Sequence, residues 1–176
     1  MNLFQVNRKL PTGRYRLGEV FSGLEMRPLL HCIKDEEHLK QILDATYVSL
    51  TDDPEYMYVN DEDGSLIIGL SYLRTGDLRY IYLDIIHELV HVKQYRDGRE
   101  LFDKSYNYVD RPTEIEAYAC CIEEGRRIGM SEETLADYLQ VEWITRDEHR
   151  RLLNTLGVQV PRHDSTLAKT HDPDSQ

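Results

Sequence analysis

The sequence predicts an α+β domain in which a small antiparallel or mixed sheet precedes a central helix and a C-terminal helical subdomain. Two short segments of β-forming residues joined by a turn predict a hairpin within residues 56–72, and strong helical signals occupy residues 78–96 and much of the chain beyond. At 176 residues the chain is long enough for one buried core and too short for two full ones. We therefore expect a single domain over residues 1–160 and a polar, disordered tail over residues 161–176.

The composition, 40% apolar and 30% charged, is ordinary for a soluble protein. No segment approaches the roughly 18 to 20 apolar residues that span a bilayer, and the first ten residues lack an apolar signal core. We therefore expect a cytoplasmic protein without a membrane partner. The formal charge of −11 argues against a nucleic-acid partner, because phosphate binding requires clustered Lys and Arg.

Cysteine chemistry is not expected to shape the fold. Cys32, Cys120 and Cys121 form no C-x-x-C pair and cannot all be bridged to one another, which indicates neither a disulfide scaffold nor a cysteine zinc site. We expect the three thiols to be reduced.

The N-terminal part of the chain begins with an irregular lead-in over residues 1–34, where Gly and Pro recur, with one short strand near residues 15–21. A helix over residues 36–45 follows. Asp35 can cap it, acidic residues occupy its first turn, and an apolar stripe, Leu39, Ile42 and Leu43, predicts one buried face.

The sheet is predicted to continue with a strand over residues 46–50 and a hairpin of residues 56–60 and 65–72. Residues 61–64 supply its turn, and Asp63-Gly64 tolerates positive φ. The acidic residues of this turn lack the spacing of an EF-hand calcium loop, so we interpret them as solvated.

The central helix is predicted over residues 78–96, with Thr75 or Asp77 as its N-cap and Asp97-Gly98 as its end. At about 100° per residue, its apolar side chains form a broad arc. A polar group, Asp84, His87, Glu88 and His91, occupies the remaining side. Burying these side chains is costly unless they are paired or bound to a metal.

Three further helices are predicted. One covers residues 114–128, with Pro112 in its first turn and Gly129 after its end. A second follows the N-cap Ser131, and a third covers residues 146–156 and ends at Gly157.

The segment His87-Glu88-Leu89-Val90-His91 fits the pattern H-E-x-x-H. Helical residues four apart lie on the same face, so His87 and His91 can both bind one zinc ion, while Glu88 flanks the metal as a base. A catalytic zinc site needs a third protein ligand and leaves its fourth position to water.

H-E-x-x-H followed by Glu-x-x-Ala on a downstream helix resembles the gluzincin group of zinc metallopeptidases, over residues 65–129. The resemblance implies a zincin-like fold, Zn²⁺ as cofactor and hydrolysis of a peptide bond in a peptide or protein substrate. It also implies a glutamate ligand from the second helix. Glu114 with Ala117 and Glu116 with Ala119 both match, and we prefer Glu114 for its Glu-Ile-Glu-Ala setting.

The resemblance further implies that Glu88 takes a proton from water activated by zinc. We name Tyr108 as the donor to the oxyanion, with Tyr106 and His149 as alternatives. The strand over residues 65–72 is expected to be an edge strand that pairs with an extended substrate.

One departure from the family concerns the aspartate that orients the first histidine. In the family this aspartate lies four residues after the glutamate ligand. Here that position is occupied by Tyr118 if Glu114 is the ligand, or by Cys120 if Glu116 is the ligand. Asp84 and Asp110 are the candidates to take over this role.

Two other hypotheses remain beside a zinc peptidase. One is a non-catalytic or regulatory metal-binding module that serves as a protein-interaction domain, and the other is a metal-free domain with a coincidental motif. The presence of Glu88 favours the enzyme, because a module that only needed metal could lose its base. The oligomeric state stays open.

Overall fold

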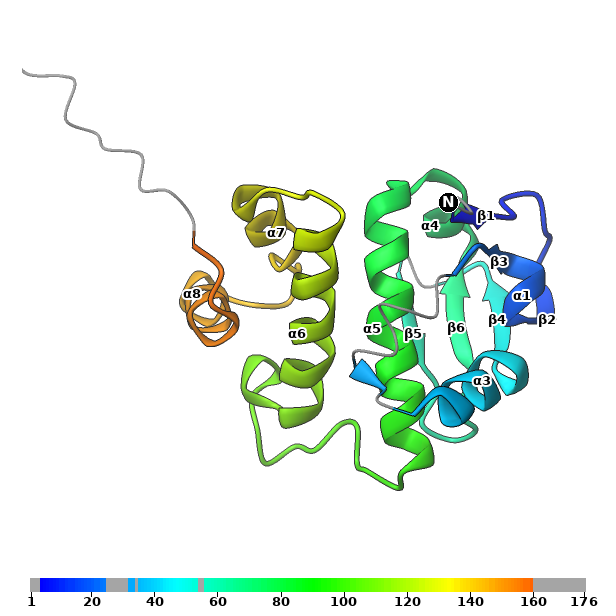
Figure 1. The fold of residues 1–176 in the computed structure, drawn as a ribbon, viewed down its shortest axis with the longest axis horizontal. Coiled ribbons are helices and arrows are strands. Elements are labelled where there is room, and N and C mark those ends of the chain that lie inside the picture. The colour runs from blue at the N-terminus through cyan, green and yellow to red at the C-terminus, as the bar shows by residue number, and fades with distance from the viewer. Residues whose placement is uncertain (1–3, 25–31, 34, 54–55, 160–176) are drawn as a thin grey trace, which may run out of the picture.

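The computed structural model describes residues 4–24, 32–33, 35–53 and 56–159, and within them the fold is mixed α+β. In Figure 1 the long helix α5, Leu78–Arg96, lies between the sheet and helix α6, Pro112–Arg127. The helices α7, Glu132–Tyr138, and α8, Arg146–Leu156, lie beyond α6. The histidine motif is therefore in the middle of the domain.

The main sheet has four strands in the order β2-β4-β6-β5. Its strands are β2 Gly13–Arg16, β4 Tyr47–Thr51, β6 Leu66–Gly69 and β5 Met57–Val59. Only β4 and β6 run parallel to each other, and the other two pairs are antiparallel, so the predicted mixed sheet is confirmed.

The predicted hairpin is confirmed, but two details of it are wrong. The second strand ends at Gly69, because Leu70 and Leu73 are buried at helical spacing and begin helix α4, Leu70–Thr75. The edge strand next to α5 is β5 and not the segment 65–72, because β6 pairs with β4 on its other side. Turn residue Gly64 has the expected positive φ of 69°.

The lead-in is not irregular where it is described. It contains β1, Gln5–Val6, the single-turn helix α1, Leu17–Val20, and β3, Phe21–Ser22, in addition to β2. Leu17, Val20 and Phe21 are buried and join these short elements to the core. Elements of two to four residues are too short to show periodicity, which is why the sequence did not reveal them. The predicted disordered tail, residues 161–176, lies outside the described residues.

The helix predictions are confirmed with their caps. Helix α3 is Glu36–Ala45, and the Asp35 side chain accepts the N–H of His38 at 3.1 Å. Asp77, and not Thr75, caps α5, accepting the N–H of Arg79 at 2.8 Å. A short 3₁₀ turn, η1 Tyr108–Asp110, precedes α6. Among the described residues, none of the helices combines the length and apolarity needed to cross a membrane.

The expectation of three reduced thiols is wrong for two of them, because Cys32 and Cys120 form a disulfide. The partners are 88 residues apart in sequence, and the fold brings their Cα atoms to 6.1 Å. Such proximity is a property of the tertiary structure and is not contained in cysteine spacing. Cys121 is free and buried, and its thiol donates to the carbonyl of Leu83 at 3.2 Å.

Two glycines with positive φ allow a matched test of packing. A Cβ at Gly64 would lie 2.5 Å from the ring of Tyr95, whereas a Cβ at Gly98 would meet nothing within 4 Å. We expect Gly98→Ala to cost about 1–2 kcal/mol from backbone strain, and Gly64→Ala to cost about 1–3 kcal/mol more from overpacking. Urea unfolding of both variants measures the free energy of unfolding that each one loses. Equal losses would contradict the close packing of Gly64 against the Tyr95 ring.

Candidate metal centre

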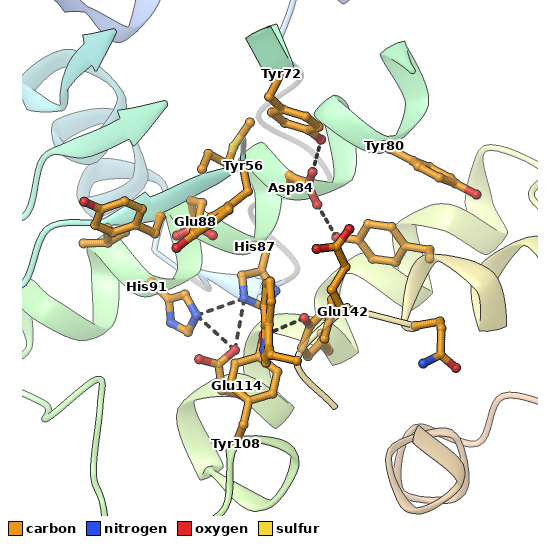
Figure 2. A pocket seen from close by; sticks show the side chains of 18 of the residues that line it. Tyr56, Tyr72, Tyr80, Asp84, His87, Glu88, His91, Tyr108, Glu114 and Glu142 are labelled. Atoms are coloured by element: carbon orange, nitrogen blue, oxygen red, sulfur yellow. Dashed lines mark hydrogen bonds and ion pairs between the residues drawn. The ribbon is translucent and has the colours of Figure 1, made fainter. Parts of the chain in front are cut away.

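Two helices bring three buried side chains to one point. His87 and His91 project from α5 one turn apart, and Glu114 projects from the first turn of α6, which packs against α5. Figure 2 shows the three converging. The His87 and His91 Nε2 atoms are 2.9 Å apart, and Glu114 Oε2 lies 3.3 Å from the first and 3.5 Å from the second. All three residues are at most 6% exposed.

These distances fit a zinc ion. With bonds of about 2.0–2.2 Å, tetrahedral zinc holds neighbouring ligand atoms roughly 3.3 Å apart. Glu114 Oε2 is buried, makes no hydrogen bond of normal geometry to the described residues and lies against the two imidazoles, so its charge needs a protonated imidazole or a bound cation beside it. In the described part of the chain, the ligand atoms of these three side chains all lie within 4.8 Å of one another, close enough to hold one metal ion. Two imidazoles and one carboxylate are a donor set that zinc accepts.

The alternative ligand Glu116 points elsewhere. Its carboxylate accepts a hydrogen bond from Gln94 Nε2 at 2.9 Å and forms an ion pair with Arg99. Neither contact brings the Glu116 carboxylate to the histidines, although Gln94 itself bonds to His91. The geometry therefore favours Glu114 between the two glutamates that the motif left open.

Gln94 orients His91, a contact that the motif did not indicate. Its amide nitrogen donates to the carbonyl of Thr113 at 3.1 Å and to Glu116, so its oxygen is free to accept the Nδ1–H of His91 at 2.7 Å. In neutral His91 this arrangement leaves the Nε2 lone pair directed at Glu114 and His87. The only sequence signal was a glutamine one turn after the second histidine.

Removal of this support should weaken metal binding. We expect Gln94→Ala to lower zinc affinity by about 10–100-fold, as is usual for partners that orient a ligand. Gln140→Ala, at an exposed glutamine, is the control and should leave the affinity unchanged. Competition with a chromogenic zinc chelator measures both, and equal affinities would contradict the orienting role.

Neither candidate for orienting His87 does so, and both predictions are wrong. Asp84 accepts hydrogen bonds from the hydroxyls of Tyr72 and Tyr138, and Asp110 pairs with Arg151 at 2.9 Å. His87 Nδ1 is buried without a hydrogen-bond partner in the described part of the chain. Its ring instead packs against that of Tyr118, with centroids 4.4 Å apart. The His87 ring is therefore held by an aromatic contact with Tyr118 and not by a hydrogen bond from Nδ1.

Glu88 is 7% exposed and lines a cavity of about 630 Å³ beside the cluster. Its Oε2 atom has no hydrogen-bond partner in the described structure. Burial raises the pKa of Glu88 to about 8, while the charge of His91 and, to a smaller extent, the Val59 backbone amide on the edge strand β5 oppose this shift. The carboxylate is therefore positioned to exchange protons near neutral pH.

Tyr108 is the predicted oxyanion donor that lines this cavity, whereas Tyr106 and His149 do not line it. Tyr106 is 46% exposed, and His149 Nε2 bonds to the carbonyl of Ala136 at 2.8 Å. The Tyr108 hydroxyl lies 2.7 Å from that of Tyr118. Burial raises the pKa of both tyrosines well above the ordinary value, so both remain hydrogen-bond donors.

Without a metal, the cluster holds a proton at neutral pH. Burial lowers the pKa of His91, but hydrogen bonding to Glu114 and the charges of Glu88 and Glu114 outweigh it and raise that pKa to about 9. The pKa of His87 is lowered by burial and by the neighbouring His91. One of the two imidazoles is thus neutral and the other carries the extra proton.

Zinc binding should release this proton, because a metal ligand must be a neutral imidazole. Below pH 9 His91 is protonated in the metal-free protein, so we expect apparent zinc affinity to rise by about tenfold per pH unit from pH 6 to 8. Calorimetry in buffers of different ionisation enthalpy measures the proton count. Affinity that is flat over this range would contradict the shared proton.

No family model matches this sequence, and neither a curated protein nor a solved structure is significantly similar to it. The assignment of a function therefore depends on the geometry and chemistry of the site itself.

Proposed function

We propose that this chain is a zinc-dependent peptidase of the gluzincin type with a zincin-like fold, which hydrolyses a peptide bond in a peptide or protein substrate. The observation that carries the proposal is the triangle of His87, His91 and Glu114, with ligand-atom distances of 2.9, 3.3 and 3.5 Å, beside the unpaired carboxylate of Glu88. His87, His91 and Glu114 would hold the ion.

Bound zinc supplies Lewis acidity, which activates water near neutral pH and polarises a carbonyl group. Glu88 accepts the proton of the attacking water and delivers it to the leaving nitrogen, so that one side chain serves as base and then as acid. Its Oε2 atom lies at the cavity without a hydrogen-bond partner among the described residues, so it is free to accept this proton.

Tyr108 donates a hydrogen bond to the oxygen that gains negative charge when water attacks the carbonyl. Its contact with Tyr118 fixes the phenol at the cavity wall. The edge strand β5 also lines the cavity, through Met57, Tyr58 and Val59. Because β5 is an edge strand of the sheet, it can pair with an extended substrate backbone, the role that the sequence had suggested for residues 65–72.

The test is hydrolysis of an unfolded protein substrate by the zinc-loaded chain and its Glu88→Gln variant side by side. Cleavage by the first and not by the second supports the proposal. If the chain is a metal-binding module without catalysis, neither protein cleaves the substrate. The carboxylate of Glu88 beside the cluster favours the peptidase over this alternative.

A further inference from the structure

The cavity beside the metal cluster has a one-sided charge. Among the described residues, no Lys or Arg lines it, whereas five carboxylates do: Asp84, Glu88, Glu114, Asp137 and Glu142. Glu114 and the histidines belong to the metal cluster, but the others leave the cavity negative even when the metal is bound. The net charge of −11 reinforces this field. A cationic ligand is attracted by such a cavity and an anionic one is repelled.

The walls of the cavity are aromatic and open to a ligand. Tyr56 and Trp143 are 47% and 55% exposed, and their ring centroids are 5.7 Å apart. Tyr58 and Phe102 add further exposed rings to the lining. Aromatic faces attract cations and also cover the aliphatic stems of lysine and arginine. Carboxylates combined with exposed rings therefore suit a long side chain that ends in a cation.

Asp84 is the carboxylate best placed to bind that cation. It precedes His87 by three and Glu88 by four residues on α5, so all three are neighbours on one side of the helix. Its Oδ1 accepts the Tyr138 hydroxyl at 2.8 Å, and its Oδ2 accepts that of Tyr72, as Figure 2 shows. A carboxylate can accept about four hydrogen bonds, which leaves room for two more.

Asp84 makes no ion pair with any residue that the structure describes. Burial raises its pKa to about 6 even though the two tyrosine hydroxyls oppose the shift, so at neutral pH it is a charged group without a counter-charge. A second carboxylate in the same cavity has an oxygen without any hydrogen-bond partner among the described residues. This carboxylate is Glu88, which lines the cavity, is only 7% exposed and has an unpaired Oε2 atom. Both observations indicate a polar ligand in the cavity.

We propose that this cavity selects substrates that carry a lysine or arginine side chain next to the scissile bond, and that Asp84 pairs with its cation. This inference rests on the proposed function and names its substrate class. Asp84 determines specificity and takes no part in the proton transfers assigned to Glu88.

The test measures binding without turnover. Zinc-loaded Glu88→Gln protein is titrated with two pentapeptides, acetylated at one end and amidated at the other, that differ only by lysine or norleucine at the central position. Trp143, the only tryptophan of the chain, lies in the cavity wall and reports binding by fluorescence. We expect the lysine peptide to bind at least about tenfold more tightly, as expected for a charge-assisted hydrogen bond.

Two substitutions in the same protein locate the effect. Asp84→Asn should remove the preference for lysine and keep the affinity for the norleucine peptide. Glu142→Gln, at an exposed carboxylate of the same lining, should change the lysine affinity by less than about threefold. If Asp84→Asn does not fold, the comparison of the two peptides with Asp84 intact still decides the proposal.

Equal binding of the two blocked peptides would overturn the inference. So would a norleucine peptide with a free N-terminus that gains the same tenfold, because the recognised cation would then be the terminal ammonium. If the wild-type protein bound no zinc but still preferred the lysine peptide, the proposed function would be overturned by the missing metal. The binding site for a cation would then still be supported by the preference. Zinc-dependent hydrolysis without a lysine preference would overturn only the specificity.

Discussion

Glu114→Ala is expected to abolish zinc binding at physiological metal concentrations. The substitution leaves two imidazoles without the carboxylate that lies 3.3 and 3.5 Å from their Nε2 atoms. Outer partners of a metal site are worth about 10–100-fold in affinity, so the loss of a direct ligand should cost more than about 100-fold. Metal analysis after dialysis against a weak chelator should find one zinc per chain in the wild type and essentially none in the variant.

Glu116→Ala is the matched control, because it removes a carboxylate two residues away on the same helix. Its contacts are with Gln94 and Arg99, outside the cluster. We expect this variant to keep its zinc with an affinity lowered only by the loosening of Gln94. If Glu116→Ala lost the metal and Glu114→Ala kept it, the identity of the third ligand would be wrong.

Glu88→Gln is expected to keep zinc and to lose peptide hydrolysis. Glutamine has the same shape but cannot accept the proton of water, and a general base contributes about 10²–10⁴-fold to the rate. The loss should appear in kcat, with KM little changed, because binding of the ground state does not need the proton transfer. Steady-state kinetics on a fluorogenic peptide, with zinc content measured in parallel, gives both quantities.

The expected combination separates a missing base from a damaged site. Full zinc occupancy with hydrolysis reduced by at least about 100-fold supports the role of Glu88. Turnover equal to that of the wild type at equal zinc content would exclude Glu88 as the base. Loss of zinc in this variant would mean that Glu88 belongs to the metal site.

The sequence was most informative where a single helix carried the signal. Helix α5 has the predicted bounds, residues 78–96, because Asp77 caps it and Asp97-Gly98 ends it. The relation between His87 and His91 follows from helical spacing alone. The Glu114 contact was less certain, because it depends on how α6 packs on α5. Glu114 and Glu116 both match Glu-x-x-Ala, and the sequence favoured Glu114 only through its Glu-Ile-Glu-Ala setting. The packing of α6 is what brings the Glu114 carboxylate to the histidines and leaves Glu116 with Gln94.

Features that depend on distant parts of the chain could not be predicted. The Cys32–Cys120 disulfide joins residues 88 apart, and the edge position of β5 depends on the parallel pairing of β4 with β6. The contact of Gln94 with His91 requires α6 to supply partners for the amide nitrogen. These arrangements arise from tertiary packing, which local patterns do not contain.

Anomalous scattering at the zinc absorption edge, from crystals of the purified protein, tests the metal centre most directly. We predict one strong peak within about 2.0–2.2 Å of His87 Nε2, His91 Nε2 and a Glu114 carboxylate oxygen. A zinc-supplemented crystal with no peak between these three side chains, or with its peak at other residues, would contradict the assignment.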